Sequence, residues 1–332
     1  MTERQRNLRL YVPVYAISLV IYLAACFVEP TFFTWNNNVN LFTRVTPLVL
    51  VGIAQTYVIL TGGIDLSIGA TVGLATVIAA SLPFVDTPSN VLLWLLIPPS
   101  IGLAVGLLNG LVITRGGFPP LIVTLATGAV WKGVSLFILA EPGGSVSSGV
   151  ATFVTGTLFG FLPVPLVVLL LSVLVFHLIL KRTAFGRSIY AIGGNERVAY
   201  ESGIPCDRVK VWVYGLSGLI GGLVGMFLSA RMSSGDPLVG EPYILNSIAV
   251  TVIAGTSLAG GRGGIIGIIG GAYIFDLLNN ILNLLAISTF YQYVAKGLVL
   301  IIALAITSGG AELRPGRLLR KGRRKELQEE NG

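Results

Sequence analysis

Long apolar runs separated by short polar or glycine-rich breaks follow one another along almost the whole chain. A run of about 20 apolar residues is the length that a helix needs to cross the hydrocarbon core of a bilayer. The pattern predicts ten such helices, near residues 10–28, 40–61, 64–82, 91–113, 119–139, 164–180, 210–230, 243–259, 264–286 and 290–308. We therefore expect an all-α polytopic membrane protein.

The composition excludes a soluble globule. Of the 332 residues, 54% are hydrophobic and only 11% are charged, and the mean hydropathy is +0.84. A soluble domain carries about 25% charged residues, so this chain has too little polar surface to cover itself. The main polar segments are residues 1–9, 181–210 and 309–332. We expect one transmembrane domain over residues 1–332, with these three segments outside the bilayer.

Lysine and arginine set the expected orientation. With ten spans both termini lie on one side of the membrane, and that side holds 18 of the 22 basic residues. They are Arg4, Arg6, Arg9, Arg115, Lys181, Arg182, Arg187, Arg197, Arg208, Lys210, Arg262, Arg314, Arg317, Arg320, Lys321, Arg323, Arg324 and Lys325. Basic loops stay in the cytoplasm, so both termini and the central loop are predicted to be cytoplasmic. The basic tail is typical of a segment that faces membrane lipid, and we infer no nucleic-acid binding from it.

The central loop, residues 181–210, contains the signature of a short helix. Asn195 is a good N-cap, Glu196 places an anion in the first turn, Gly203 suits a left-handed C-terminal position, and Pro205 blocks continuation. Such a helix is too short to be stable in water alone. It is interpreted either as a docking element for a soluble partner, which would approach the small mid-helix residue Ala199, or as an ordered loop without a partner.

The sequence holds no recognisable catalytic or metal-binding motif. The single histidine, His177, lies near the cytoplasmic end of the predicted span 164–180 and is interpreted as interfacial. No Walker phosphate-binding loop is present, so ATP used in transport would be bound by another subunit. Cys26 and Cys206 fall on opposite sides of the membrane in this topology, which argues against a disulfide between them.

One predicted span carries a polar face. Asp276, Asn279, Asn280 and Asn283 are spaced at i, i+3, i+4 and i+7, so they share one side of a helix. An aspartate near the middle of a span costs roughly 3 kcal/mol on insertion, so the face must turn to protein or to a wet cavity. Two readings stay open: polar contacts between helices, or the lining of a path for a hydroxyl-rich solute.

Three further polar residues fall in or beside predicted spans. Asp65 follows the Gly62-Gly63 break and is interpreted first as the N-cap of the next span, with a role at the translocation path as the alternative. Lys132 and Lys296 are embedded cations that snorkel or pair with carboxylates.

The sequence also contains a weak internal repeat. The segments that begin at Val58 and Val252 each combine an apolar helix, a glycine break and a glycine-rich helix. Transporters are often built from such related halves, although glycine richness alone also produces the pattern.

Four ordered blocks resemble a known family, the permease subunits of bacterial ABC importers for ribose and related monosaccharides. The blocks are T-Y-V-I-L-T-G-G-I-D-L-S-I-G-A from Thr56, Y-A-I-G-G-N-E-R-V-A-Y-E-S-G-I from Tyr190, I-A-G-T-S-L-A-G-G-R-G-G-I-I-G from Ile253 and L-L-N-N-I-L-N-L-L-A-I-S-T-F-Y-Q from Leu277. The resemblance extends from about Pro30 to Ile306. One departure is the segment Tyr243-Ile244-Leu245-Asn246, where relatives commonly have an acidic E-L-D after the aromatic residue.

The resemblance implies a set of partners. Such permeases form a membrane dimer with a second copy or a paralogue, receive sugar from a periplasmic binding protein, and dock a cytoplasmic ABC ATPase that binds ATP and Mg²⁺. This chain would then hold no cofactor itself. The docking loop carries Gly194, Asn195, Glu196, Ala199 and Gly203.

The expected function is therefore the membrane-spanning part of an ATP-driven importer in the bacterial inner membrane, moving a ribose-like monosaccharide. Asp65, Asp276, Asn279, Asn280 and Asn283 are the candidate translocation path. The alternative is a stand-alone secondary carrier or a channel for a small polar solute. A carrier would need an internal site for a coupling ion, and the embedded charges are few.

Overall fold

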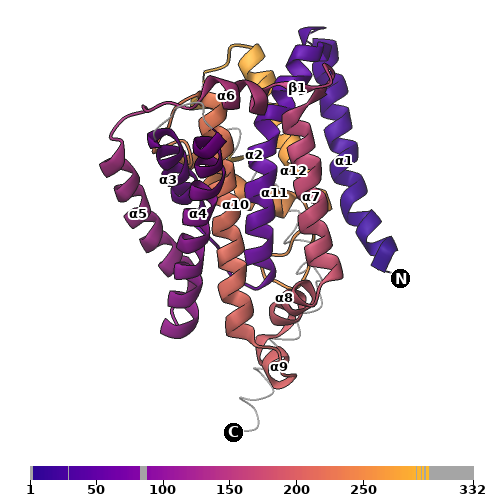
Figure 1. The fold of residues 1–332 in the computed structure, drawn as a ribbon. Coiled ribbons are helices and arrows are strands. Elements are labelled where there is room, and N and C mark those ends of the chain that lie inside the picture. The colour runs from indigo at the N-terminus through magenta and orange to yellow at the C-terminus, as the bar shows by residue number, and fades with distance from the viewer. Residues whose placement is uncertain are drawn as a thin grey trace.

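The structure is a computed structural model in which almost all regular structure is helical (Figure 1). It describes residues 3–28, 30–82, 88–288, 290–292, 294 and 297–298, with the backbone alone at residues 3–11, 28, 30–31, 88–89 and 284. The elements are α1 (Glu3–Val28), η1 (Pro30–Phe33), α2 (Trp35–Leu60), α3 (Ile68–Ser81), α4 (Pro88–Gly116), α5 (Pro120–Ile138), α6 (Ser148–Thr155), β1 (Thr157–Leu158), β2 (Leu162–Pro163), α7 (Val164–Arg182), α8 (Ala184–Gly194), α9 (Glu196–Glu201), α10 (Cys206–Met232), α11 (Glu241–Ile253) and α12 (Ile266–Leu284).

The apolar helices agree with the predicted pattern. Within the described residues, α2, α4, α5, α7, α10 and α12 are long and apolar enough to cross a membrane, and α1, α3 and α11 contribute shorter apolar stretches. Each of these nine elements coincides with one predicted span, and the tenth, 290–308, lies largely outside the described residues. The chain is a polytopic membrane protein.

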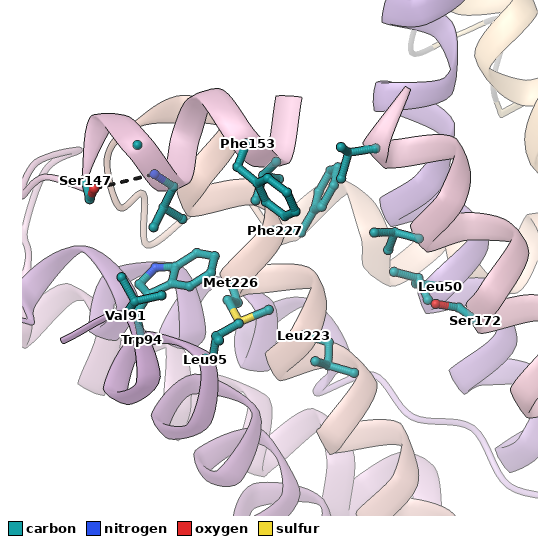
Figure 2. A pocket seen from close by; sticks show the side chains of 15 residues that line it. Leu50, Val91, Trp94, Leu95, Ser147, Phe153, Ser172, Leu223, Met226 and Phe227 are labelled. Carbon is teal, nitrogen blue, oxygen red and sulfur yellow. Dashed lines mark hydrogen bonds between the residues drawn. The ribbon is translucent and has the colours of Figure 1, made fainter. Parts of the chain in front are cut away.

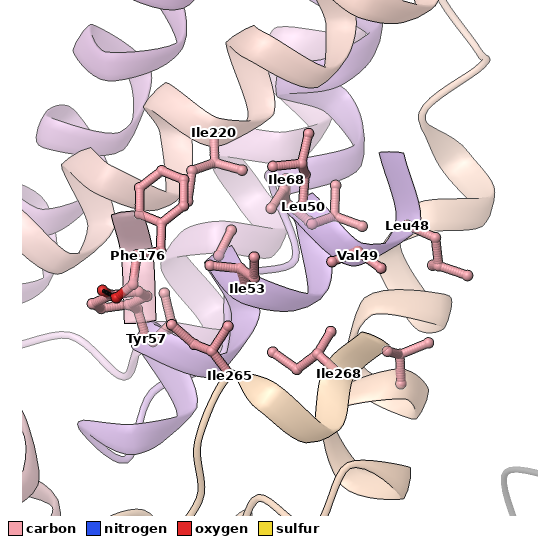
Figure 3. Packing of buried hydrophobic residues seen from close by; sticks show 14 of the residues in the cluster. Leu48, Val49, Leu50, Ile53, Tyr57, Ile68, Phe176, Ile220, Ile265 and Ile268 are labelled. Carbon is pink, nitrogen blue, oxygen red and sulfur yellow. Dashed lines mark hydrogen bonds between the residues drawn. The ribbon is translucent and has the colours of Figure 1, made fainter. Parts of the chain in front are cut away.

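Helix α2 is the centre of the bundle. It packs against α7, α10, α11 and α12, and its buried face forms the core with residues such as Ile53, Ile220 and Ile268 (Figure 3). Polar side chains tie it to its neighbours. Tyr57 donates its hydroxyl to the Phe176 carbonyl oxygen at 2.6 Å. Such hydrogen bonds between helices supply specificity where both neighbours are apolar.

Helices α4 and α10 pack backbone against backbone. Gly102, Gly106 and Gly110 repeat every fourth residue, so they line one face of α4. A Cβ on Gly102 would lie 2.2 Å from the Gly218 carbonyl oxygen, and one on Gly106 would lie 2.1 Å from the Tyr214 carbonyl oxygen. Small residues at this spacing let membrane helices approach closely.

Two breaks interrupt helices inside the bundle. The first, residues 61–67, joins α2 to α3, and the second, residues 254–265, joins α11 to α12. Gly62 and Gly260 adopt left-handed φ values of 82° and 83°, which explains glycine at both positions. The Gly261 amide donates to the Leu60 carbonyl oxygen at 3.0 Å. The two segments that echo each other in sequence therefore meet in space.

The predicted spans need correction at these breaks. The span predicted at 64–82 begins only at Ile68, and the one predicted at 243–259 ends at Ile253. In both cases the residues that continue the apolar run form turns whose amides bond locally, such as Gly63 to the Val58 carbonyl oxygen. Apolar length alone does not distinguish a helix from a buried turn.

The two ends of the bundle carry different small elements (Figure 1). The hairpin of β1 and β2, which pairs Leu158 with Leu162, lies at one end together with α6. Helices α8 and α9 project from the opposite end. Helix α6 and the hairpin lie between the spans predicted at 119–139 and 164–180, where the apolar pattern predicts no element. Their runs are shorter than the windows that periodicity can detect.

Candidate functional site

Asn195 joins two short helices in the central loop. Its backbone amide donates to the Ala191 carbonyl oxygen at 3.1 Å, which ends α8. Its side-chain oxygen accepts from the Val198 amide at 3.1 Å, which starts α9. The predicted N-cap is therefore confirmed, and α9 spans Glu196–Glu201 as the cap predicts. Helix α8 was not predicted, although Thr183 caps it by accepting from the Gly186 amide at 3.2 Å.

The far end of α9 is fixed by Gly203 and by a charge pair. Gly203 has a φ of 82°, the left-handed conformation predicted for it, and its amide donates to the Tyr200 carbonyl oxygen at 2.9 Å. The Glu196 carboxylate pairs with the Lys210 ammonium group of α10. Helix α9 is thus held by the chain itself as well as by its caps.

The interpretation of Ala199 as the point of approach for a partner is wrong. Ala199 is only 4% exposed and belongs to the hydrophobic core, because the inner face of α9 packs against the bundle. Its neighbours Val198 and Tyr200, 56% and 73% exposed, point outwards instead. A surface for a partner on α9 therefore includes these two side chains, together with the exposed Arg197 and Glu201, rather than Ala199.

Gly193, at the end of α8, contacts both helix breaks. A Cβ at this position would lie 1.8 Å from the Leu60 carbonyl oxygen and 2.4 Å from the Gly261 amide nitrogen. The Tyr190 hydroxyl adds a hydrogen bond to the Gly263 carbonyl oxygen at 2.8 Å. Gly194, which the resemblance assigns to the docking loop, has no atom within 4 Å of its added Cβ, and its role in docking stays a prediction. The close-packed glycine is Gly193.

A small polar cavity of about 330 Å³ lies where α8, α9 and α10 meet the first break. Its walls include Thr61, Gly63, Asn195, Glu196, Lys210 and Tyr214. The N-cap residue of α9 and the Glu196–Lys210 pair therefore line the same cavity as the break between α2 and α3. Any displacement of α9 will change its shape.

The polar face of α12 contacts α2 near the opposite end. Asp276 and Asn280 are buried, Asn279 is half-buried and Asn283 is exposed. Asp276 Oδ2 lies 3.4 Å from Arg44 Nε, and Asn280 donates to Asn37 Oδ1 at 3.1 Å. The shared face was predicted correctly, but Arg44 was missed. These bonds are contacts between helices, and a role of the same face in a path stays a prediction.

Asp65 is fully buried at the start of α3. Its carboxylate accepts the Ser67 amide at 2.9 Å, the Ser67 hydroxyl at 2.6 Å and the Ser217 hydroxyl of α10 at 2.7 Å. The N-cap position itself is held by Ser67, so the assignment of Asp65 as N-cap is corrected by two residues. The Asp65 side chain instead organises the turn before the helix. Its role in a path is still a prediction.

The embedded cations were predicted to snorkel or to pair. Lys132 of α5 pairs with the Glu241 carboxylate at the start of α11. Lys296 lies outside the described residues.

A second cavity, away from the short helices, is not suited to a sugar. It measures about 810 Å³ and lies between α4, α6, α7 and α10, with Trp94, Leu95, Phe153, Leu223, Met226 and Phe227 among its walls (Figure 2). Two serines, Ser147 and Ser172, are its only hydroxyl residues. A sugar needs several hydrogen-bonding partners to leave water, so this apolar cavity is not a candidate for the path.

The apolar helices form a bundle in which two helix breaks meet next to the short helices α8 and α9. This arrangement defines a multi-pass membrane protein of the transporter type. Residues 37–304 match the family described as "Branched-chain amino acid transport system / permease component", and the chain belongs to this family.

Curated relatives are similar along nearly their whole length. The chain is 40% identical over 290 residues to the "Ribose import permease protein RbsC" of Bacillus subtilis, covering 86% of this chain and 89% of the relative. It is 35% identical over 296 residues to RbsC of Escherichia coli, covering 87% and 90%. The "D-allose transport system permease protein AlsC" of Escherichia coli is 32% identical over 299 residues, covering 88% and 89%. No solved structure matches the chain.

Proposed function

We propose that this chain is the membrane-spanning permease subunit of an ATP-driven importer that takes up a ribose-like monosaccharide. The names of the similar permeases support the substrate class, since they include ribose, D-allose and galactose importers. The sugar would be delivered by a periplasmic binding protein. A cytoplasmic ABC ATPase would bind ATP and Mg²⁺, because this sequence has no Walker loop.

The proposed architecture has about ten spans in the bacterial inner membrane, both termini in the cytoplasm, and a second permease copy or a paralogue as partner. The positive-inside distribution of lysine and arginine supports this orientation. The basic loop that contains α8 and α9 would then face the ATPase.

One observation carries the proposed coupling: Gly193 of α8 lies against Leu60, the last residue of α2 before the first break, and against Gly261 in the second break. An ATPase bound to the exposed side chains of Val198 and Tyr200 would displace α9 when it moves. Because Asn195 joins α9 to α8, this displacement would also move α8. Because Gly193 meets backbone on both sides, a shift of α8 displaces both breaks together. This is a route by which ATP binding could reorient helices that line a path.

A stand-alone carrier or a channel remains the alternative function. Either would move its solute without an ATPase. Uptake by proteoliposomes that contain only this chain would therefore favour the alternative over the importer.

Tyr200→Arg is expected to abolish co-purification of the partner ATPase and the stimulation of ATP hydrolysis by sugar-loaded binding protein. The new charge replaces an apolar contact on the outer face of α9, whereas the inner face with Ala199 stays packed. The permease alone should hydrolyse no ATP. Phe159→Arg is the matched control, since Phe159 is 88% exposed at the opposite end. If Tyr200→Arg retains the ATPase, the docking surface lies elsewhere, around Arg115 or Arg262.

The orientation can be tested with introduced cysteines. Cys206 is buried and is a poor target for labelling, so the test uses Ser202→Cys and Phe159→Cys in a chain with both native cysteines replaced. An impermeant thiol reagent applied to intact spheroplasts should label Phe159→Cys and leave Ser202→Cys unlabelled until the membrane is opened. The reverse pattern would invert the proposed topology.

A further inference from the structure

We propose that Asp65, Asn109, Ser217 and Tyr214 form a buried site for a small monovalent cation, of which Na⁺ is the probe. The site lies where the start of α3 meets α4 and α10. Its test needs neither sugar nor ATPase, so it does not rest on the proposed function. A bound ion by itself does not make the chain a secondary carrier, which would in addition need sugar uptake driven by a Na⁺ gradient without an ATPase.

The first observation is a buried carboxylate with neutral partners only. Asp65 is 1% exposed, and its carboxylate accepts hydrogen bonds from the Ser67 and Ile68 amides and from the Ser67 and Ser217 hydroxyls. Among the described residues no lysine or arginine pairs with it. The N-terminus of α3 offers a partial positive charge, which compensates a full negative charge only in part. A buried carboxylate without a counter-charge is strongly unfavourable.

The second observation is the unpartnered oxygen of Asn109. Asn109 is fully buried, and its Nδ2 donates to Ser67 Oγ at 2.7 Å, while its Oδ1 has no partner. The orientation of this carboxamide is fixed chemically. The single hydroxyl hydrogen of Ser67 goes to Asp65, so Ser67 must accept from Asn109, and the free end is the carbonyl oxygen.

The third observation is the Tyr214 hydroxyl. Tyr214 is 1% exposed, and its Oη is buried without a hydrogen-bond partner. It lies against Gly63, where an added Cβ would be 2.3 Å from this oxygen, and within electrostatic range of Asp65. Buried polar atoms are nearly always satisfied by protein, water or a ligand. Asn109 bonds to Ser67 and Tyr214 lies against Gly63, so both unsatisfied oxygens belong to residues that contact the turn around Asp65, and a positive ligand would satisfy them and compensate the carboxylate.

The donor set indicates the kind of cation. It offers one carboxylate, one carboxamide oxygen and two hydroxyl oxygens with lone pairs left over. Hard cations take oxygen ligands of this kind. A single negative charge neutralises a monovalent ion, whereas a divalent ion would leave a buried positive charge.

The polar cavity of about 330 Å³ provides access. Gly63 and Tyr214 are part of its wall, and Glu196 and Lys210 are part of the same cavity towards the short helices. The cation would reach the cluster from this cavity through Tyr214, the one residue of the proposed site that forms part of its wall. Once bound, it would join α3 to α4 and α10, so it should stabilise the folded protein by binding only that state.

The test measures the thermal stability of the purified full chain at one pH. NaCl is titrated against choline chloride at constant ionic strength, and direct binding of ²²Na⁺ is measured in parallel. We expect a saturable rise of several degrees in the melting temperature that is specific to Na⁺. Asp65→Asn should abolish both the rise and the binding. Asp207→Asn, which removes an exposed carboxylate at the start of α10, should retain them.

Tyr214→Phe separates a ligand role from a structural one. Without Na⁺ this variant should be at least as stable as the parent, since it removes a buried hydroxyl that has no partner. With Na⁺ its stabilisation should need at least tenfold more salt. The proposal is overturned if Na⁺ and choline act alike, if Asp65→Asn keeps the Na⁺ response, or if Tyr214→Phe responds at the parent's salt concentration.

Discussion

Replacing Gly193 by alanine is expected to abolish the stimulation of ATP hydrolysis by sugar-loaded binding protein and to destabilise the permease. The added methyl group would lie 1.8 Å from the Leu60 carbonyl oxygen and 2.4 Å from the Gly261 amide nitrogen. Both obstacles are backbone, so no side-chain rotation relieves the clash. Overpacking costs about 1–3 kcal/mol, and we expect the upper end of this range. The measurements are the melting temperature in detergent and ATPase activity in proteoliposomes.

Gly194→Ala is the matched control, because the adjacent glycine has no atom within 4 Å of the added Cβ. We expect Gly194→Ala to keep the melting temperature of the parent. If Gly193→Ala is as stable and as well coupled as Gly194→Ala, then the contact of α8 with the two breaks has no part in coupling. A variant that loses stability but keeps full stimulation would assign Gly193 to folding alone.

Removing one partner of the Arg44–Asp276 pair should damage the protein more than removing both. Asp276→Leu leaves the Arg44 guanidinium group without this carboxylate. Breaking a fully buried ion pair costs about 3–5 kcal/mol, and because the Arg44 side chain is 30% exposed we expect a smaller loss here. The double variant Arg44→Met/Asp276→Leu replaces both charges by apolar groups. Its loss of stability should be smaller than the sum of the single losses by at least about 1 kcal/mol. The free energy of unfolding is measured by heat or denaturant for four proteins: the parent, Arg44→Met, Asp276→Leu and the double variant. These four values complete the double-mutant cycle.

Sugar uptake by the same four proteins decides between the two readings of the polar face of α12. A double variant that regains both stability and uptake assigns Asp276 to contacts between helices. One that regains stability without uptake assigns it to the path. Strictly additive losses would show that Arg44 and Asp276 do not act as a pair.

Local signals were read correctly from the sequence. The N-cap Asn195, the left-handed Gly203 and the shared face of Asp276 and Asn280 depend on residues a few positions apart, and each stands in the structure as predicted. The rise and period of a helix determine such relations without knowledge of the fold. The lengths of the apolar runs located nine of the predicted spans at apolar helices of the described residues, and the full count of about ten stays a prediction.

Relations between distant segments could not be read in this way. Ala199 looked accessible because nothing local marks the face of α9 that packs on the bundle. Gly193 and Gly194 are adjacent and chemically identical, and only the position of Leu60 and Gly261 separates their roles. Arg44 sits 232 positions before Asp276. The four-residue spacing of Gly102, Gly106 and Gly110 was a readable signal for close helix packing that went unused.

The shortness of α3 constrains how the protein is made. Its 14 residues reach about 21 Å at 1.5 Å per residue, less than the roughly 30 Å of hydrocarbon that a span must cross. As it leaves the ribosome, this segment with Asp65 at its head has no partner for its carboxylate beyond Ser67 and Ile68. Asn109 and Ser217, which complete the cluster, are synthesised 44 and 152 residues later. We therefore expect stable integration of α3 to wait for α4 and α10, so that the order of membrane insertion differs from the order of synthesis.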